Sequence, residues 1–315
     1  MSHCPITYEA TMESRYSQSG LRSLSRDLKE LKTLPYDAEQ QRREATLRAT
    51  KMSIQGMQPK MSARLNVKGG QFEIVDIDGR YILKPQHLVY PSLPENEGLT
   101  MHLAGLCGIE APTSGLVLSQ DGTWTYFVRR FDRVRRKDKI PLEDFAQLSG
   151  LSRDTKYDFS MEKLIPILDR YCTFPAIEKV KLLKRCLFNF VVGNEDMHLK
   201  NFSLISWEGK IELAPAYDYL NTTVAFLAAG RRIEDIEEIA LPLDGKKRHL
   251  TRKTWIEYFA AERIGLPGKI VDGVLEDLFQ AQFIWQERIA DSFLPISQKE
   301  SYTTLLQSRL ELLSS

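Results

Sequence analysis

The stretch "GNEDMHLKNFSL" (193–204), continued by "ISWEGKIELAPAYDY" (205–219), decides how this chain folds around its most polar cluster. An acid, a histidine, a lysine and an asparagine stand within six residues, directly after an apolar run. Such a cluster is costly to desolvate, so we expect it at a rim or in a cleft. Two short strands, 202–206 and 210–213, are predicted around a Glu208-Gly209 turn. Because a hairpin brings its open ends together, side chains just before and just after it can meet.

Three oxygen-bearing side chains flank this hairpin, with Asp196 and Asn201 before it and Asp218 after it. Two carboxylates and an amide suit a hard cation such as Mg²⁺, which usually shares its shell with phosphate. Asp196 and Asn201 also have the D-x-x-x-x-N spacing of the protein-kinase catalytic loop. In that loop the aspartate accepts the substrate hydroxyl proton and the asparagine holds metal. The spacing alone is common by chance, and the hairpin with its returning Asp218 makes it more specific.

A kinase also needs a strand lysine for the α- and β-phosphates and a glutamate on the next helix to orient it. Lys84 ends the predicted strand "YILK", and Glu97 opens the helix predicted after it, in the required order. Taken alone, Glu97 would be a solvated acid in a first helical turn, where the helix dipole favours it. The pattern as a whole predicts ATP- and Mg²⁺-dependent phosphoryl transfer.

The composition is that of a globular protein with a proper core. The chain has 315 residues, of which 43% are hydrophobic and 27% charged, so two lobes or domains are expected. The net charge of +1 argues against strong non-specific binding to nucleic acid or acidic membranes. The four cysteines are far apart and form no CxxC pair, which indicates reduced, mostly buried thiols. No signal pattern or membrane-length apolar run is visible, so a cytoplasmic protein is expected.

Three regions differ in pattern along the chain. Residues 1–50 form a predicted helical arm, with helical periodicity in 21–34 and turn and cap candidates at Pro35 and Asp37. Residues 51–138 form a predicted β-rich lobe in the order β-β-α-β-β, with tight turns at Gly69-Gly70, Asp78-Gly79 and Asp121-Gly122. Residues 139–315 are predicted to be helical apart from the hairpin. The fold class is therefore α+β, a bilobal protein-kinase-like fold with a small antiparallel-β N-terminal lobe and a larger all-helical C-terminal lobe.

Six segments, in this order, resemble the HipA-like serine/threonine kinases of bacterial toxin–antitoxin systems. They are "SIQGMQPK" (53–60), "YILKPQ" (81–86), "PENE" (94–97), "VRRFDR" (128–133), "GNEDMHLKNFS" (193–203) and "APAYDY" (214–219). HipA itself carries an extra N-terminal subdomain before its phosphate loop. Here that loop follows a short arm, which is similar to the shorter HipT-like toxins, in which a separate small protein resembles the missing subdomain.

The resemblance implies a role for each matching residue. Asp196 would be the catalytic base, Asn201 and Asp218 the Mg²⁺ ligands, and Lys84 the phosphate clamp that Glu97 orients. At the hinge, two side chains would contact adenine, namely Arg129 and Phe131. The loop covering the ATP phosphates would comprise Ser53, Ile54, Gln55, Gly56, Met57, Gln58 and Lys60.

The chain departs from the usual kinase pattern in two places. It has no G-x-G-x-x-G, so phosphate contacts must rely on backbone N–H groups around the single Gly56. His198 stands where ordinary kinases have a lysine two residues after the base. We interpret it as a positioning group, with a surface or capping histidine as the alternative, and Lys200 would neutralise charge instead. Many relatives have a second serine where this chain has Gln55, so Ser53 is the serine predicted to be autophosphorylated.

The resulting hypothesis is a toxin kinase that phosphorylates a serine or threonine of a cellular protein, with an aminoacyl-tRNA synthetase as the implied target class. The implied partners are a small HipS-like protein and a DNA-binding HipB-like antitoxin, without membrane or direct specific nucleic-acid binding. The alternative is a nucleotide-binding pseudokinase acting as an interaction module, although such proteins typically lose the base or a metal ligand. A small-molecule or lipid kinase is disfavoured by the family segments. The basic run in 129–139 is interpreted as a solvated loop, with docking of an RNA-associated substrate as its alternative.

Overall fold

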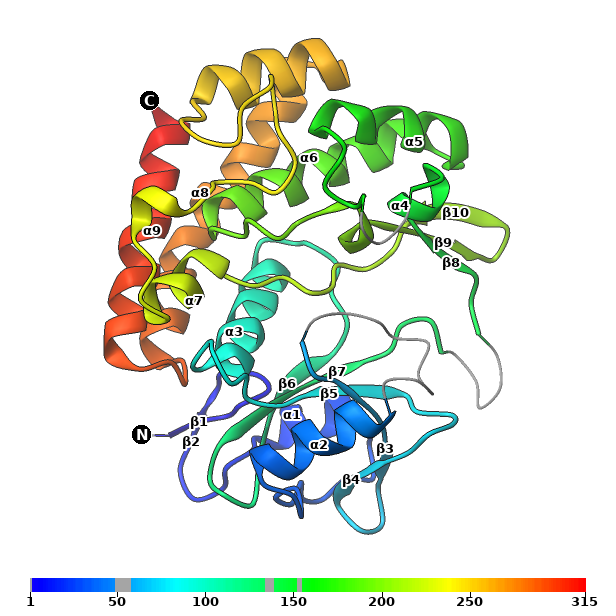
Figure 1. The fold of residues 1–315 in the computed structure, drawn as a ribbon, viewed down its shortest axis with the longest axis vertical. Helices are drawn as coiled ribbons and strands as arrows, with labels where there is room; N and C mark the ends of the chain where they lie inside the picture. The colour runs from blue at the N-terminus through cyan, green and yellow to red at the C-terminus, as the bar shows by residue number, and fades with distance from the viewer. Residues whose placement is uncertain (1, 49–57, 134–138, 152–154) are drawn as a thin grey trace.

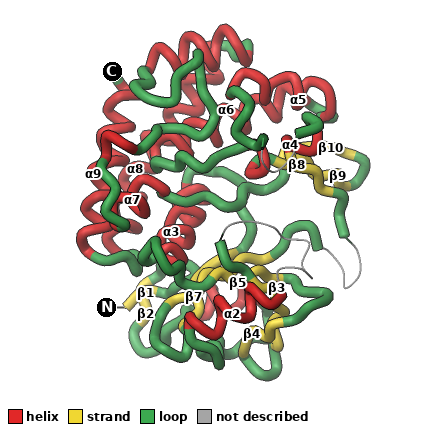
Figure 2. The backbone as a smooth tube through the Cα atoms, viewed as in Figure 1, coloured by secondary structure: helices red, strands yellow, loops and turns green. Residues whose placement is uncertain are grey.

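The computed structural model describes residues 2–48, 58–133, 139–151 and 155–315, which form two lobes (Figure 1). The lower lobe in this view holds the larger group of strands, and the upper lobe is mainly helical (Figure 2). The predicted α+β, bilobal, protein-kinase-like fold is therefore confirmed. Within the described ranges, no helix combines the length and the apolar character needed to cross a membrane.

The N-terminal lobe is built on a five-stranded sheet in which every neighbouring pair is antiparallel, in the order β4-β3-β5-β7-β6. Three strands precede the helix, rather than the two predicted. Because β3 lies between β4 and β5, the Asp78-Gly79 turn is a crossover and not the predicted hairpin turn. The hairpins at 69–70 and 121–122 are confirmed. The strands are β3 (Met61–Asn66), β4 (Gln71–Ile74), β5 (Tyr81–Lys84), β6 (Ser114–Leu118) and β7 (Trp124–Arg129).

Strand alternation sorts the side chains of this sheet into two separate cores, because successive residues of a strand point to opposite faces. On β7, Phe127 belongs to the core beneath the N-terminal arm, whereas Tyr126 and Val128 belong to the core shared with helix α3 (Leu93–Leu106). On β5, Leu83 faces the arm. Lys84 therefore lies on the α3 face of the sheet.

The N-terminal arm packs across the other face, but less of it is helical than predicted. Helix α1 (Gln18–Leu24) ends well before residue 34, whereas Leu28, Leu31 and Leu34 are still buried. The chain there is held beside the sheet's turns, since the Lys32 amide donates to the Gly70 carbonyl in the β3–β4 connection and the Leu34 amide donates to the Leu118 carbonyl at the end of β6. Two short strands pair ahead of α1, and a second helix follows. These elements are β1 (Ser2–His3), β2 (Ala10–Thr11) and α2 (Ala38–Arg48).

The predicted cap of α2 is confirmed. The Asp37 carboxylate accepts the Gln40 amide at 2.7 Å, while the Gln40 side chain accepts the Asp37 amide at 3.0 Å. These reciprocal bonds satisfy N–H groups that the first helical turn leaves unpaired.

The C-terminal lobe is mainly helical, and it is not all-helical as predicted. The expected hairpin is present as β9 (Ser203–Trp207) and β10 (Lys210–Leu213), and β8 (Leu142–Asp144) adds a third antiparallel strand to it. Sequence reasoning missed β8 because its partner is the distant β9. The other elements are α4 (Phe145–Leu148), η1 (Met161–Lys163), α5 (Leu164–Tyr171), α6 (Pro175–Val191), η2 (Leu199–Asn201), α7 (Thr222–Ala228), η3 (Ile233–Asp235), the π-helical η4 (Thr254–Ile264), α8 (Gly268–Asp291) and α9 (Ile296–Ser314).

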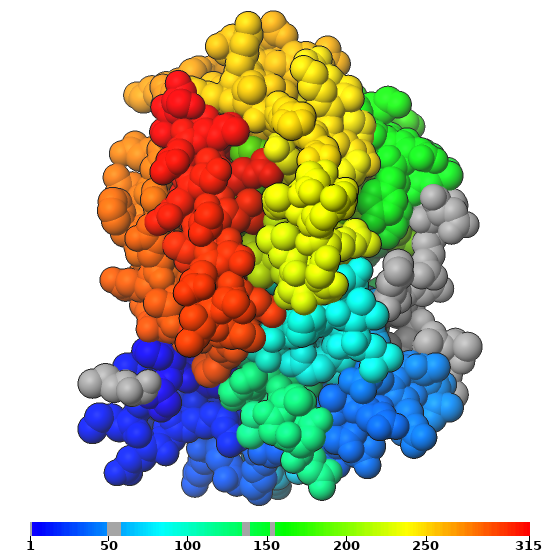
Figure 3. Space-filling model, turned by 60° about the vertical axis from the view of Figure 1, so that its left-hand side comes forward, coloured from blue at the N-terminus to red at the C-terminus, as the bar shows by residue number. Residues whose placement is uncertain are grey.

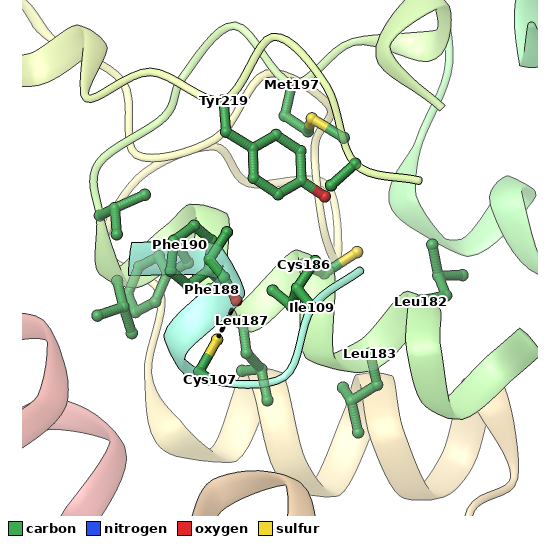
Figure 4. Packing of buried hydrophobic residues seen from close by; sticks show 14 of the residues in the cluster. Cys107, Ile109, Leu182, Leu183, Cys186, Leu187, Phe188, Phe190, Met197 and Tyr219 are labelled. Carbon is green, nitrogen blue, oxygen red and sulfur yellow. Dashed lines mark hydrogen bonds between the residues drawn. The ribbon is translucent and has the colours of Figure 1, made fainter. Parts of the chain in front are cut away.

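Helix α6 is the centre of the larger core, and the segments that carry polar site residues are anchored on it. Figure 4 shows Met197 and Tyr219 packed over α6 side chains that include Cys186 and Phe188. The Tyr219 ring stacks on the Phe188 ring with centroids 5.8 Å apart. Since Met197 follows Asp196 and Tyr219 follows Asp218, burial of the second residue of each pair fixes the direction of the first.

Helix α3 joins the two lobes. Its region lies between the C-terminal helices and the N-terminal lobe (Figure 3). The Trp285 indole donates to the Leu103 carbonyl at 2.9 Å, and the hydroxyls of Thr100 and Tyr302 are 3.0 Å apart. The helix is therefore fastened to α8 and α9 as well as to the sheet.

The four cysteines carry free thiols, as predicted. Cys4, Cys107 and Cys186 are buried and Cys172 is half-buried. Burial raises the pKa of the Cys172 thiol to about 12, which makes it a poor nucleophile near neutral pH.

Candidate active site

Lys84 and Glu97 form a buried ion pair where the sheet meets α3. The Lys84 Nζ lies 2.5 Å from Oε1 of Glu97, and each side chain is 3% exposed. Burial alone would lower the pKa of Lys84, but the charges of Asp218 and Glu97 outweigh it and raise that pKa above its ordinary value. Burial raises the pKa of Glu97, against the pull of Lys84. The strand lysine and the helix glutamate expected of a kinase are thus in contact.

Asp218 completes this cluster from the other lobe. Its Oδ1 lies 2.6 Å from Lys84 Nζ, and its backbone has a φ of 57°, in the left-handed region. Burial would raise the pKa of the carboxyl, but Lys84 and then Lys60 outweigh that effect and lower the pKa to about 2. The side chain keeps 39% of its surface exposed, so the carboxylate is ionised and open towards solvent.

The loop after α6 depends on a glycine and an asparagine. Gly193 has a φ of 71°, and an added Cβ would come within 2.4 Å of Leu305 Cδ2, so a larger residue does not fit. The buried Asn194 side chain donates to Asn189 Oδ1 at 2.7 Å and accepts the Asp196 amide at 3.1 Å. These contacts fix the backbone directly before and at Asp196.

Asp196 is the exposed member of the site, with 52% of its side chain accessible. Its Oδ1 accepts a hydrogen bond from the Tyr157 hydroxyl, and His198 Nε2 lies 3.8 Å away from it. A carboxylate at a rim, held from one side and open on the other, suits a base that receives a proton from a macromolecular substrate.

Asn201 faces back to the same loop. Its Nδ2 donates to the Asp196 carbonyl at 2.8 Å, so its Oδ1 remains as a possible metal ligand. Lys84 contacts only one of the two carboxylate oxygens of Asp218 in the described contacts. The remaining amide and carboxylate oxygens are donors that Mg²⁺ prefers. Mg²⁺ usually shares its coordination shell with phosphate, so a protein donor set as small as this fits it. Among the described residues, no cluster of three or more His, Cys, Asp or Glu could hold a metal.

Other predicted residues lie around this centre. His198 is 6% exposed and sits in the loop beside Asp196. The Phe131 ring lies 5.8 Å from the ring of Tyr217, the residue before Asp218. The charge of Lys60 helps to lower the pKa of Asp218 and opposes the burial that raises the pKa of Glu97. Gln58 is half-buried. The rest of the predicted phosphate loop, namely Ser53, Ile54, Gln55, Gly56 and Met57, lies outside the described residues.

Two predicted residues point elsewhere. The Arg129 guanidinium lies on the arm face of the sheet, opposite Lys84, and donates to the Leu24 carbonyl at 2.6 Å and to the Tyr81 hydroxyl. It anchors the arm, and its side chain is not among the groups that meet at the site. Lys200 directs its Nζ to Asp144, at 3.9 Å, while its carbonyl accepts the Tyr217 hydroxyl at 2.8 Å.

The family model described as "HipA-like C-terminal domain" matches residues 52–284, well over half of the chain. The chain belongs to this HipA-like family. A putative kinase of Haemophilus influenzae is 26% identical over 96% of this chain and 93% of its own length. The putative kinase Y4mE of Sinorhizobium fredii is 35% identical over 50% of this chain, but only 43% of its own length. The serine/threonine-protein kinase toxin HipA of Shewanella oneidensis is 27% identical over 62% of this chain and 47% of its own length.

Two solved structures have the HipA-like fold seen here. The Shewanella oneidensis HipA in complex with HipB and its operator DNA aligns with a TM-score of 0.66 at 23% identity, over 90% of this chain and 72% of that chain. The Helicobacter pylori proinflammatory kinase CtkA aligns with a TM-score of 0.58 at 16% identity, over 84% of this chain and 92% of that chain. At these identities the similarity shows the fold.

Sequence reasoning missed several residues of this HipA-like site. Tyr157 and Lys156 reach the Asp196 loop from a segment without a recognisable pattern. Asn96, next to Glu97, is 1% exposed and makes two bonds to the backbone of Asn221, at 2.9 Å to its carbonyl and 2.8 Å from its amide. The "PENE" segment contained Asn96, but its partner lies 125 residues away, so no local signal could reveal the contact.

Proposed function

We propose that this chain is an ATP- and Mg²⁺-dependent serine/threonine protein kinase. The observation that carries the proposal is the contact of one buried lysine, Lys84, with both Glu97 and Asp218. A lysine held by a helix glutamate, beside a metal-binding aspartate, is the arrangement on which kinases rely to place the ATP phosphates. The family membership and the putative kinases among the relatives support it.

Each residue has a distinct task in the transfer. Lys84 would bind the α- and β-phosphates, with Glu97 holding its ammonium group in place. Asn201 Oδ1 and the Asp218 carboxylate would hold Mg²⁺, which supplies neutralisation of the phosphate charge. Asp196 would accept the hydroxyl proton as the serine or threonine oxygen bonds to the γ-phosphorus. The bond from that phosphorus to the β,γ-bridging oxygen breaks, and ADP leaves with the electron pair.

Transfer can be tested with the purified chain, radiolabelled ATP, MgCl₂ and casein as a generic acceptor. Labelling that requires Mg²⁺ and disappears in Asp196→Ala supports the kinase. Nucleotide binding without transfer in the wild-type chain would instead support the pseudokinase alternative. A phosphoproteomic comparison of cells that express the intact chain and Asp196→Ala then identifies the substrate.

The proposal extends to a toxin of the short HipT type, acting in the cytoplasm on a cellular protein such as an aminoacyl-tRNA synthetase. A HipB-like antitoxin is suggested by the similar HipA that was solved with HipB and operator DNA. A small HipS-like protein would bind as well. Because the arm buries one face of the β-sheet, such a partner would dock elsewhere on the lobe. Co-purification from the native host tests this, and recovery of the chain alone would count against it.

Ser53 is proposed as an autophosphorylation site. It opens the "SIQGMQPK" segment, and a phosphate would add roughly −1.5 to −2 charges beside the ATP phosphates. That charge would repel the nucleotide and reduce activity. Peptide mass spectrometry after incubation with ATP and Mg²⁺ tests it, and an unmodified Ser53 in an active enzyme would exclude it.

A further inference from the structure

Two consecutive residues from a distant segment lie against the Asp196 loop. Lys156 and Tyr157 belong to the connection between α4 and η1, and the Leu199 amide donates to the Lys156 carbonyl at 3.5 Å. Lys156 Nζ lies 2.7 Å from Nε2 of His198, and the Tyr157 hydroxyl donates to Asp196 Oδ1. The dipeptide therefore touches both His198 and Asp196.

The side chains in this contact also touch one another. The rings of Tyr157 and His198 meet edge to face, with centroids 5.1 Å apart. Lys156 Nζ also lies 4.8 Å from the centre of the Tyr157 ring, a cation–π distance. Each of the four side chains thus contacts at least two of the others, which restricts the positions of Lys156, Tyr157, His198 and Asp196.

The loop's own lysine does not fill this place. His198 occupies the position, two residues after the base, where ordinary kinases have a lysine. Lys200 directs its amine towards Asp144 at 3.9 Å. Lys156 is instead linked to Asp196 by way of His198.

We propose that Lys156 is a positioning residue for the catalytic base: it holds the His198 ring and, with Tyr157, fixes the Asp196 carboxylate for proton acceptance. This role rests on the proposed kinase function. An ammonium group has donors and no acceptor, so Lys156 donates to Nε2 and His198 carries its proton on Nδ1. With its Nε2 lone pair engaged, His198 cannot take the hydroxyl proton, and Asp196 remains the base.

The electrostatics agree with this assignment. Burial lowers the pKa of His198, Asp196 opposes that effect, and Lys156 lowers the pKa further. The neutral ring transmits position without adding a charge, and the Lys156 ammonium is linked to the Asp196 carboxylate through the His198 and Tyr157 side chains.

The test compares Lys156→Met, Lys156→Arg and a matched control, Lys163→Met. Lys163 is the last residue of η1, just after this connection, and its amine lies 5.5 Å from the Phe159 ring. We expect Lys156→Met to lower kcat at least about tenfold, with the KM for Mg·ATP changed less than about twofold. Lys156→Arg keeps the charge and the donors, so it should recover most of the rate. Lys163→Met should behave as wild type.

A second measurement does not depend on activity. ¹⁵N NMR of the His198 ring, assigned by the signal lost in His198→Gln, should shift in Lys156→Met and remain unchanged in Lys163→Met. An unchanged kcat or an unchanged ring signal in Lys156→Met would overturn the proposal. So would a loss of kcat in Lys200→Met with no loss in Lys156→Met. A wild-type chain that neither binds Mg·ATP nor transfers phosphate would instead remove the proposed function, and the positioning role with it.

Discussion

The Lys84 ammonium group lies 2.5 Å from a carboxylate oxygen of Glu97, and the two side chains are each 3% exposed. A charge in such a place is expensive when it is alone, because the protein interior does not replace its lost hydration. The pair therefore constrains the relative position of β5 and α3. Asp218, 2.6 Å from the same ammonium group, extends that constraint to the C-terminal lobe.

Lys84→Met should abolish phosphoryl transfer and also destabilise the fold. It leaves Glu97 buried without a counter-charge, a change that typically costs about 3–5 kcal/mol. Adding Glu97→Gln removes the uncompensated charge, so the double variant should regain part of the free energy of unfolding and none of the activity. Urea denaturation and ATP turnover measure the two effects separately. A Lys84→Met protein as stable as wild type would contradict the buried-pair interpretation.

Asp196→Asn and Asp218→Asn should both abolish transfer, for different reasons. The first removes the proton acceptor and leaves the metal ligands intact, so Mg²⁺-dependent binding of ATP should persist. The second removes a ligand and the partner of Lys84, so the affinity for Mg·ATP should fall while the affinity for Mg²⁺-free ATP changes less. Titration with a fluorescent ATP analogue, with and without Mg²⁺, distinguishes them. Wild-type turnover in Asp196→Asn would contradict the assigned base.

The site residues that could be found from the sequence alone are those that lie in short, recognisable local patterns. Lys84 ends an alternating strand, Glu97 opens a helix, and Asp196 and Asn201 share one loop. Arg129 shows the limit of that approach, because a match to the family motif does not tell on which face of the sheet the side chain lies. Strand alternation does give it: Phe127 and Arg129 are two residues apart and share the arm face.

The parts that sequence reasoning missed depend on contacts between distant segments. The leucine spacing in 21–34 fits a helix, but hydrogen bonds to the sheet's turns keep that chain out of helical conformation after Leu24. Strand β8 forms because β9 offers it an edge. The roles of Lys156 and Asn96 could not be found from local patterns, because they depend on contacts with remote loops.

Asn96→Asp should impair catalysis as well as stability. The substitution loses the donor to the Asn221 carbonyl and places a carboxylate there, so the first turn of α3 shifts relative to the segment after Asp218. We expect kcat to fall about tenfold and the KM for Mg·ATP to rise, with a stability loss of about 1–3 kcal/mol. Steady-state kinetics well below the unfolding temperature measure the effect.

The matched control for Asn96 is Tyr302→Phe. It removes another buried contact of α3, the Tyr302 hydroxyl 3.0 Å from Thr100, but it leaves both bonds to Asn221 in place. Its stability should drop by about 1 kcal/mol and its kinetics should match wild type. Equal kinetic losses in the two variants would mean that Asn96 only supports the fold.

Glu95 is a second buried acid in the first turn of α3, and it faces an amide instead of a lysine. The Gln86 side chain donates to both of its carboxylate oxygens, at 3.0 and 2.8 Å, and no ion pair to it occurs among the described residues. Burial raises the pKa of Glu95 from its ordinary value of 4.5 to about 7. The folded state therefore holds this proton more tightly than the unfolded chain does.

Stability should therefore fall as pH rises through this pKa. The stability that comes from the tighter binding of this proton is fully present below about pH 4.5 and is lost as pH passes about 7. A pKa shift of this size corresponds to about 3 kcal/mol in the free energy of unfolding. Glu95→Gln cannot ionise, and its carbonyl can still accept from Gln86. We expect Glu95→Gln to be more stable than wild type at pH 8 and to lose less stability between pH 5 and 8. Urea denaturation at both pH values measures this, with Glu143→Gln on the exposed surface as the control. An equal pH dependence in wild type and Glu95→Gln would contradict the raised pKa of Glu95 in the folded protein.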